Sequence, residues 1–264
     1  MIGSAWRQLL RLIALIVIAG IALQLYFLLR VALMAVVDPQ STTFQRSEAW
    51  RLLSERHQLL WSQQWVGYDR IAPNLKRAVI ASEDAGFVEH SGVEWEAVEK
   101  AWERNQRAEA RVERLNEQLE RRAAKLGQGR QAPPKPVAKV QPKVVGGSTI
   151  TQQLAKNLFL DGERNIARKG QEFVITMMLE AMLPKRRILE IYLNNVEWGE
   201  GLFGAEAAAR HYFRMPAQSL GAMQAAQLAV MLPAPKRFEK RPGSAYVVGR
   251  AGTIASRMGA IDPP

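Results

Sequence analysis

The sequence of 264 residues contains no cysteine, which excludes a disulfide, a thiolate-bound metal and a cysteine nucleophile. Its three histidines, His57, His90 and His211, show no HExxH spacing, which argues against a zinc hydrolase. The sequence also lacks a GxxxxGK[ST] nucleotide loop, a run of alternating strands and an internal repeat. A hydrophobic content of 48% excludes a wholly disordered chain.

One long apolar run lies near the N-terminus. Leu12–Leu29 has no charged residue and one amide, Gln24, and the run resumes after a single arginine. About 20 apolar residues span a bilayer. A cleaved signal peptide is the alternative, but its apolar region is about 7–15 residues long and is followed by small residues, whereas Tyr26 and Phe27 are bulky. We therefore expect residues 12–37 to form an uncleaved transmembrane helix.

The charges beside this run indicate its orientation across the membrane. Arg7 and Arg11 precede it on a short tail, and two positive charges there favour a cytoplasmic N-terminus. We therefore expect a cytoplasmic tail over residues 1–11, an anchor in the inner membrane and the remaining chain in the periplasm. This position argues against nucleic acid as a partner, although a net charge of +11 is typical of proteins that bind an anion.

The rest of the chain divides by composition. A membrane-proximal connector covers residues 38–75, with helical stretches around Ser47–Gln63, and its Trp61 and Trp65 suit either the lipid headgroups or a protein core. A dense, mostly helical domain follows at 76–242. The tail at 243–264 has proline, glycine and small residues, and we expect it to fray. Within the domain, apolar spacing predicts helices over Ile150–Phe159, Arg168–Leu183, Arg187–Asn195, Gly204–Phe213 and Leu220–Leu232.

A charged insert interrupts this domain at residues 103–145. Residues 103–126 are strong helix formers with a narrow apolar stripe, and residues 127–143 hold four prolines and two glycines, which predict an extended linker. Eleven lysines and arginines against five glutamates give the insert a net charge of +6, over half of the total. The insert suits a solvated helix on a tether, or contact with anionic lipid or a partner helix.

Two segments hold unusual clusters of polar residues. In Glu83–Gly92, two adjacent carboxylates follow an apolar run and precede His90. From the residues alone, this is either a solvated helix end or the edge of a site. In Gly146–Asn157, two glycines lead through Ser148 and Thr149 into a helix. Such a start supplies an N-cap and unpaired N–H groups that bind an anion.

Cations follow the second cluster closely. Lys156 lies two turns along the expected helix, and Arg164, Arg168 and Lys169 come next, with a carboxylate at Glu172. The pattern suits a diphosphate-binding site. A capped helix with exposed cations is the alternative.

At these residues the sequence resembles the peptidoglycan glycosyltransferases, most closely the monofunctional, membrane-anchored type related to class A penicillin-binding proteins. The family pattern E-D-x-x-F-x-x-H-x-G is present at Glu83–Gly92, G-G-S-T-I-T-Q-Q-L-x-K-N at Gly146–Asn157, and R-K-x-x-E at Arg168–Glu172. Two further motifs resemble Arg187–Asn194 and Gly204–Phe213. The transpeptidase signals S-x-x-K and K-T-G do not occur.

The resemblance implies a mostly α, lysozyme-like bilobal fold behind the single transmembrane helix. It implies a hexosyltransferase that moves the lipid-linked glycan chain from undecaprenyl diphosphate to the 4-hydroxyl of the GlcNAc of lipid II. Because an α-linked donor gives a β-1,4-linked product, one inverting displacement fits the reaction. Glu83 is then the general base, and the cations offset the charge of the leaving diphosphate.

The positions that match the family give the expected site. Its catalytic residues are Glu83 and Glu172, the second of which holds cations, a metal ion or the diphosphate in place. Its substrate-binding residues are Asp84, Phe87, His90, Ser148, Thr149, Gln152, Gln153, Lys156, Asn157, Arg164, Arg168 and Lys169. The residues themselves indicate no metal site, but the family implies sensitivity to a divalent cation, Mg²⁺ or Mn²⁺. The expected partners are lipid II, the lipid-linked glycan chain, the membrane, and cell-division or elongation proteins.

Two other functions compete with this one. A lysozyme-like hydrolase explains a catalytic glutamate, but a neutral glycan needs no cluster of cations. A non-catalytic membrane scaffold explains the insert but leaves both polar clusters without a role. In relatives, the segment between the first two motifs is shorter and partly apolar, so the charged insert is a departure from the family pattern.

Overall fold

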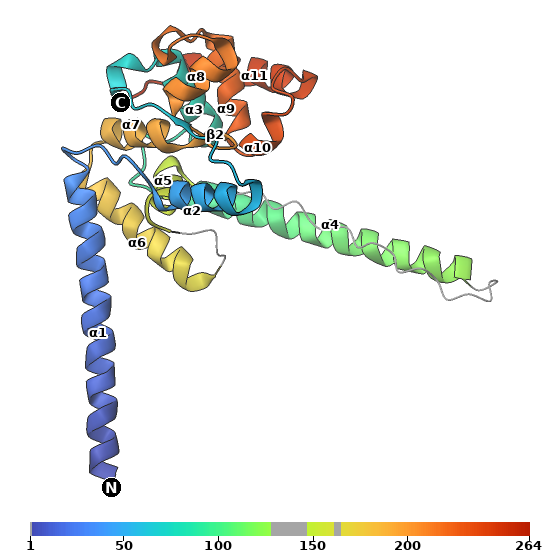
Figure 1. The fold of residues 1–264 in the computed structure, drawn as a ribbon. Coiled ribbons are helices and arrows are strands. Elements are labelled where there is room, and N and C mark those ends of the chain that lie inside the picture. Colours follow the sequence, from blue (N-terminus) through green and yellow to red (C-terminus); the bar gives the residue numbers. More distant parts are fainter. Residues whose placement is uncertain (1, 128–146, 161–164) are drawn as a thin grey trace. The chain divides into compact units, whose positions relative to one another are not determined.

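The computed structural model describes residues 2–127, 147–160 and 165–264, and it is mostly α-helical, as the sequence predicts. The chain forms two compact units, one of Met1–Val93 with Thr149–Pro264 and one of Glu94–Ser148. Figure 1 shows the elements of each unit. Arg164 and most of the expected proline-rich linker, residues 128–143, lie outside the described residues.

Helices make up most of the first unit. They are α1 (Ile2–Leu33), α2 (Thr43–Arg51), α3 (Pro73–Glu83), α5 (Ile150–Phe159), α6 (Ile166–Met182), α7 (Lys185–Asn195), α8 (Ala205–Phe213), α9 (Ala222–Met231), α10 (Pro235–Phe238) and α11 (Ala245–Arg257). Single helical turns cover Leu52–Arg56, Tyr68–Arg70, Ala217–Ser219 and Met258–Ala260. The five helices expected between residues 150 and 232 are confirmed, with each end within two residues of its predicted position.

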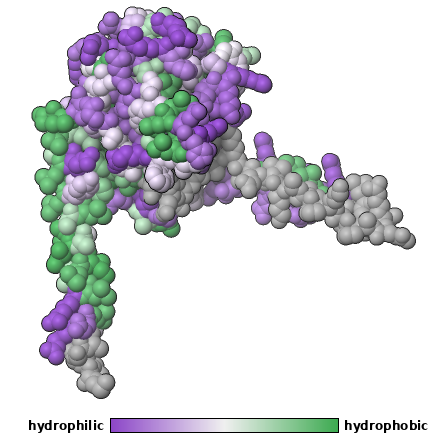
Figure 2. Space-filling model, in the orientation of Figure 1, coloured by the Kyte–Doolittle hydropathy of each residue, from purple (hydrophilic) through white to green (hydrophobic). Residues whose placement is uncertain are grey.

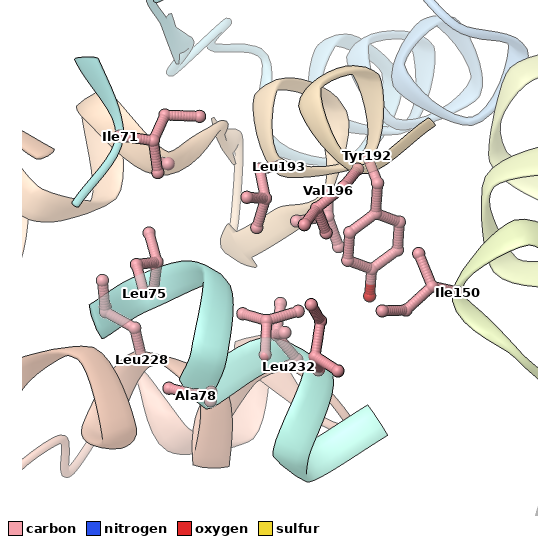
Figure 3. Packing of buried hydrophobic residues seen from close by; sticks show 14 of the residues in the cluster. Ile71, Leu75, Ala78, Ile150, Tyr192, Leu193, Val196, Leu228 and Leu232 are labelled. Atoms are coloured by element: carbon pink, nitrogen blue, oxygen red, sulfur yellow. The ribbon is translucent and has the colours of Figure 1, made fainter. Parts of the chain in front are cut away.

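Packing in the hydrophobic core of this unit fixes the position of α3, the helix that ends at Glu83. Leu75, Ala78 and Val79 are buried on one face of α3, at the spacing of three and four residues that a helix requires. They pack against α9 and α11, and Figure 3 shows Leu75 and Ala78 together with Leu228 of α9. Burial of one face of α3 therefore fixes the position of Glu83 at its last turn.

A small sheet lies beside these helices, and the sequence did not predict it. Its strands β1 (Ser62–Gln63), β2 (Glu197–Gly199) and β3 (Leu202–Phe203) lie in the order β1-β3-β2, with β1 parallel and β2 antiparallel to β3. Ser62 pairs with Leu202, and Glu197 with Phe203. Strands of two or three residues are too short to show an alternating pattern.

The connector is less helical than expected. The helical stretch predicted over Ser47–Gln63 is wrong after Arg56, because His57 adopts a left-handed conformation (φ 53°) that ends the turn before it. Of the two tryptophans, Trp65 packs against the hydrophobic core, which favours the interpretation as a core residue. Trp61 is 37% exposed, although its ring lies 4.7 Å from that of Phe203, so its role stays open.

The expectation of a frayed tail is also wrong. The helix α11 begins at a capped residue, Ser244, and buries Val247, Ala251 and Ile254 against α9 and α3. Small residues allow this close packing, so the composition that suggested fraying instead serves a helix contact.

The first helix is long and apolar enough to cross a membrane. Trp6–Leu33 has a mean hydropathy of 2.7 over its best window, and only 6% of that window is buried. Figure 2 shows the apolar surface along most of this helix. Its C-terminal end differs, because Phe27, Val31 and Met34 are buried in the core of the unit. Nearer the N-terminus of α1, the side chain of Gln24 makes hydrogen bonds of 2.8 and 3.1 Å with the side chain of Gln171 in α6.

The second unit consists mainly of α4 (Trp95–Gly127). This helix begins eight residues before the predicted start at residue 103. Ion pairs at i,i+4 spacing run along it: Lys100 with Glu96 at 2.5 Å, Arg107 with Glu103 at 3.0 Å, and Arg121 with Glu117 at 3.7 Å. Because these pairs are exposed, solvent screens them and each contributes little to stability.

Candidate active site

Glu83 is a partly buried carboxylate at the C-terminal end of α3. Its Oε2 accepts a hydrogen bond of 3.1 Å from Nε2 of Gln153 in α5, and its Oε1 accepts one of 3.4 Å from Ser82. Burial raises the pKa of Glu83, the two hydrogen bonds lower it, and the charge of Asp84 raises it again, with a net upward shift. A carboxylate with a raised pKa is a better proton acceptor, as a general base requires.

Asp84 joins the first polar cluster to the second. Its Oδ1 lies 2.8 Å from Nε2 of His90, and its Oδ2 accepts a hydrogen bond of 2.9 Å from the backbone N–H of Ile150. The N–H of Gly92 donates to Nδ1 of His90 at 3.0 Å, so Nε2 is the nitrogen that donates to Asp84. Asp84 therefore holds the loop after α3 against the start of α5.

Thr149 completes this junction. As the N-cap of α5 it accepts from the N–H of Gln152 at 3.2 Å, and its hydroxyl donates to the backbone oxygen of Gly92 at 2.6 Å. Gly92 has a φ of 88°, and a Cβ there would lie 2.7 Å from Cγ2 of Thr176. The close approach of the loop to α6 therefore requires a glycine at this position.

Glu172 lies in α6 with two cations. Its carboxylate contacts Nη1 of Arg168 at 3.1 Å and also Nζ of Lys169. Glu172 is buried, whereas Lys169 is half exposed. Nε of Arg168 is buried and has no hydrogen-bond partner in the described part of the chain. Two cations and one carboxylate leave one net positive charge near a helix start, where Asn165 is the N-cap, and this arrangement suits an anion.

A partly buried ion pair ties three helices together. Oε1 of Glu180 in α6 accepts from the hydroxyl of Thr151 in α5 at 2.5 Å and from Nζ of Lys185 in α7 at 2.8 Å. The ammonium group of Lys185 also lies 4.6 Å from the ring centre of Phe87. The helix α6, which carries Glu172 and its two cations, is therefore fixed to α5, whose Gln153 contacts Glu83.

The structure brings the predicted residues into two groups. Hydrogen bonds connect Glu83, Asp84, His90, Thr149, Gln152 and Gln153, and a second set connects Glu172, Arg168 and Lys169. Ser148 precedes the N-cap of α5, and Lys156 and Asn157 lie along that helix.

Three predicted substrate-binding residues have other partners. The ring of Phe87 is fully buried, both oxygens of Asp84 are hydrogen bonded, and Gln152 closes the capping box of α5. These contacts hold the surrounding segments together, and a role of the three side chains in binding substrate stays a prediction. Sequence reasoning assigned no role to Glu180 or Tyr192. The signal for each is a polar group between apolar neighbours: Glu180 follows Leu179 in α6, and Tyr192 stands between Ile191 and Leu193 in α7.

The chain matches a family model described as "Transglycosylase" over residues 52–124 and 136–259. The chain belongs to the transglycosylase family. Among its relatives, the biosynthetic peptidoglycan transglycosylase of Burkholderia pseudomallei (strain K96243) is 49% identical over 246 residues, which are 93% of this chain and 84% of the relative. The protein of the same name in Paraburkholderia phytofirmans (strain DSM 17436 / LMG 22146 / PsJN) is 47% identical over 259 residues, 98% of this chain and 94% of the relative. The helical, lysozyme-like fold expected from the resemblance is the fold of this family.

Proposed function

We propose that this transglycosylase polymerises lipid II into β-1,4-linked glycan strands by one inverting displacement. Its family and its relatives named biosynthetic peptidoglycan transglycosylase make peptidoglycan glycan synthesis its activity. The observation that carries the mechanism is the position of Glu83, a partly buried carboxylate held by an amide N–H at the end of a packed helix.

Glu83 removes the proton from the 4-hydroxyl of the acceptor GlcNAc. The oxygen attacks the anomeric carbon of the lipid-linked chain, the bond from that carbon to the diphosphate oxygen breaks, and the diphosphate leaves with the electron pair. Arg168 and Lys169, held by Glu172, stabilise the charge on this leaving group. The Nε of Arg168, which has no partner among the described residues, is a further donor for a phosphate oxygen.

The anchor and its orientation belong to the same proposal. The chain crosses the inner membrane once through α1 and carries its catalytic domain in the periplasm, where lipid-linked substrate and cell-division or elongation proteins meet it. Three observations support an uncleaved anchor. Phe27, Val31 and Met34 of this helix are buried in the core, its exposed part is apolar, and Arg187 donates to the backbone oxygen of Met34 at 2.8 Å. Cleavage beyond residue 34 would remove core side chains.

A divalent cation at Glu172 does not fit the contacts observed. Both carboxylate oxygens already carry a cationic partner, which would repel Mg²⁺ or Mn²⁺. No step is therefore assigned to a metal at this residue. Dependence of activity on Mg²⁺ or Mn²⁺ stays a prediction, which activity before and after treatment with EDTA tests.

The test of this function is polymerisation of labelled lipid II by the detergent-solubilised full chain. We expect high-molecular-weight glycan that a muramidase digests. Release of soluble fragments from purified cell wall, without synthesis of polymer, would instead support the hydrolase. No product of either kind from folded protein, in detergent and in vesicles, would contradict the proposed activity.

A further inference from the structure

Tyr192 is a buried tyrosine whose hydroxyl has one hydrogen-bond partner within the described part of the chain. It lies in α7, is 1% exposed, and donates to Oε1 of Gln153 at 3.0 Å. Figure 3 shows its hydroxyl oxygen beside Ile150, at the start of α5. Burial raises the pKa of Tyr192 well above its usual value, as do the charges of Glu83 and Asp84, so the phenol stays protonated and remains a donor.

The other end of the same amide faces Glu83. Nε2 of Gln153 donates to Oε2 of Glu83 at 3.1 Å. An amide has one oxygen and one NH₂ group, so a donor on one side fixes which end points to the other. If the amide of Gln153 turned over, its oxygen would face the carboxylate of Glu83, and the hydroxyl proton of Tyr192 would lose its acceptor.

We propose that Tyr192 is a positioning residue for glycosyl transfer, which keeps the amide of Gln153 turned so that its N–H faces Glu83. The inference rests on the proposed role of Glu83 as the base. Tyr192 does not touch substrate; it acts through Gln153. The consequence is a base that is ionised at lower pH than its burial alone would allow, since a hydrogen bond to the charged form lowers a carboxyl pKa.

Few other charges act on Glu83. Asp84 lies next to it and opposes its ionisation, while Asp84 itself is paired with His90. The helix α9, which packs on α3, has no charged residue, and the arginines of α11, Arg250 and Arg257, are exposed. The charged residues of α7, which packs beside α5, are all paired. Lys185 pairs with Glu180, and Arg186 pairs with Asp69. Arg187 pairs with both Asp38 and Glu190.

The test is the pH profile of kcat/KM for lipid II polymerisation by the full chain. The activity of a base rises with pH through its pKa, so the acidic limb reports Glu83. We expect Tyr192→Phe to move this limb to higher pH by about one unit. At pH values below the acidic limbs of both enzymes, the activity of the variant should be about tenfold lower. The plateau and KM should change little. Tyr212→Phe is the control, because it removes another hydroxyl from a partly buried tyrosine, one that donates to the backbone oxygen of Trp198 at 2.8 Å.

A double-mutant cycle separates positioning from simple packing. We expect Gln153→Ala to raise the limb by itself and Tyr192→Phe to add no further shift in that background. An unchanged limb in Tyr192→Phe, an equal loss of activity at every pH, or a shift that persists without Gln153 would overturn the proposal. An inactive wild type would instead contradict the proposed function, so the two failures are distinguishable. If Tyr192→Phe fails to fold, the limb of Gln153→Ala still decides whether this amide holds the base, and an unmoved limb there overturns the proposal.

Discussion

Glu197 is a buried carboxylate in β2, far along the chain from the first polar cluster. Its Oε1 has no hydrogen-bond partner among the residues described, and Nζ of Lys236 lies 3.5 Å from it. Lys236 lies closer to Oε1 of Glu48, at 2.6 Å. Burial raises the pKa of Glu197 to about 7, although Lys236 lowers it, and the charge of Glu48 adds to the rise. Of the two carboxylates beside Lys236, Glu197 is therefore paired more weakly than Glu48.

The pH dependence of stability follows from this pKa. Between the usual value of 4.5 and about 7, the folded protein keeps a proton on Glu197 that the unfolded chain releases. The contribution of Glu197 to stability is full below pH 4.5 and is lost as pH rises through 7.

We expect Glu197→Gln to remove this loss, because the amide keeps the shape without the charge. The variant should match the wild type at pH 4 and gain up to about 3 kcal/mol at pH 8. Thermal unfolding in detergent at the two pH values measures the difference. Glu55→Gln, which alters an exposed carboxylate, is the control. A Glu197→Gln effect that is the same at both pH values would exclude titration of this group.

At the scale of elements, the start of α5 joins stability to catalysis. Thr149 caps α5 and also bonds the backbone oxygen of Gly92. Thr42 caps α2 with the same capping box, made with Gln45, but is not part of the site. Loss of either cap should cost about 1–2 kcal/mol.

The two caps therefore predict different effects on activity. We expect Thr149→Ala to lower both the unfolding temperature and kcat, because the loop that holds Asp84 and His90 loses a fixed point. Thr42→Ala should lower only the unfolding temperature, and Thr149→Ser should restore both properties. Parallel unfolding and lipid II assays measure this. Equal kcat values for Thr149→Ala and Thr42→Ala would show that the junction has no catalytic role.

At the scale of the whole molecule, the proposed anchor α1 predicts that the two ends of the chain lie on opposite sides of the membrane. The absence of native cysteine allows single introduced thiols to report each side. Gln8 precedes the apolar span, and Gly243 is exposed at the far end of the chain with no atom within 4 Å of an added Cβ.

We expect a membrane-impermeant maleimide to label Gly243→Cys in intact spheroplasts and Gln8→Cys only after lysis, since Arg7 and Arg11 favour a cytoplasmic N-terminus. The cysteine-free wild type is the control for background. Labelling of Gln8→Cys without lysis would reverse the orientation.

The sequence predicted features that depend on neighbouring residues. Ile150–Phe159 was predicted to the residue, because its cap at Thr149 and its apolar spacing are both local. The motifs named residues that hydrogen bonds link in the structure, such as Glu83 with Gln153, and the roles of these residues stay predictions. The bond between Tyr192 and Gln153 spans 39 positions, and only the packing of α7 on α5 creates it. The prediction for the tail was wrong because small residues are common in disordered ends of chains. Here a small residue, Ala251, is instead buried in α11, which packs on α9.

The most direct test of the account is the rate of lipid II polymerisation by Glu83→Gln, compared with the wild type and with Glu89→Gln. The substitution of Glu83 keeps the shape and removes the base, whereas Glu89 is an exposed carboxylate of the same segment. We predict a loss in kcat of at least about a hundredfold for Glu83→Gln and near-normal rates for Glu89→Gln. A folded Glu83→Gln enzyme that polymerises within a few-fold of the wild-type rate would contradict the role of Glu83 as the base.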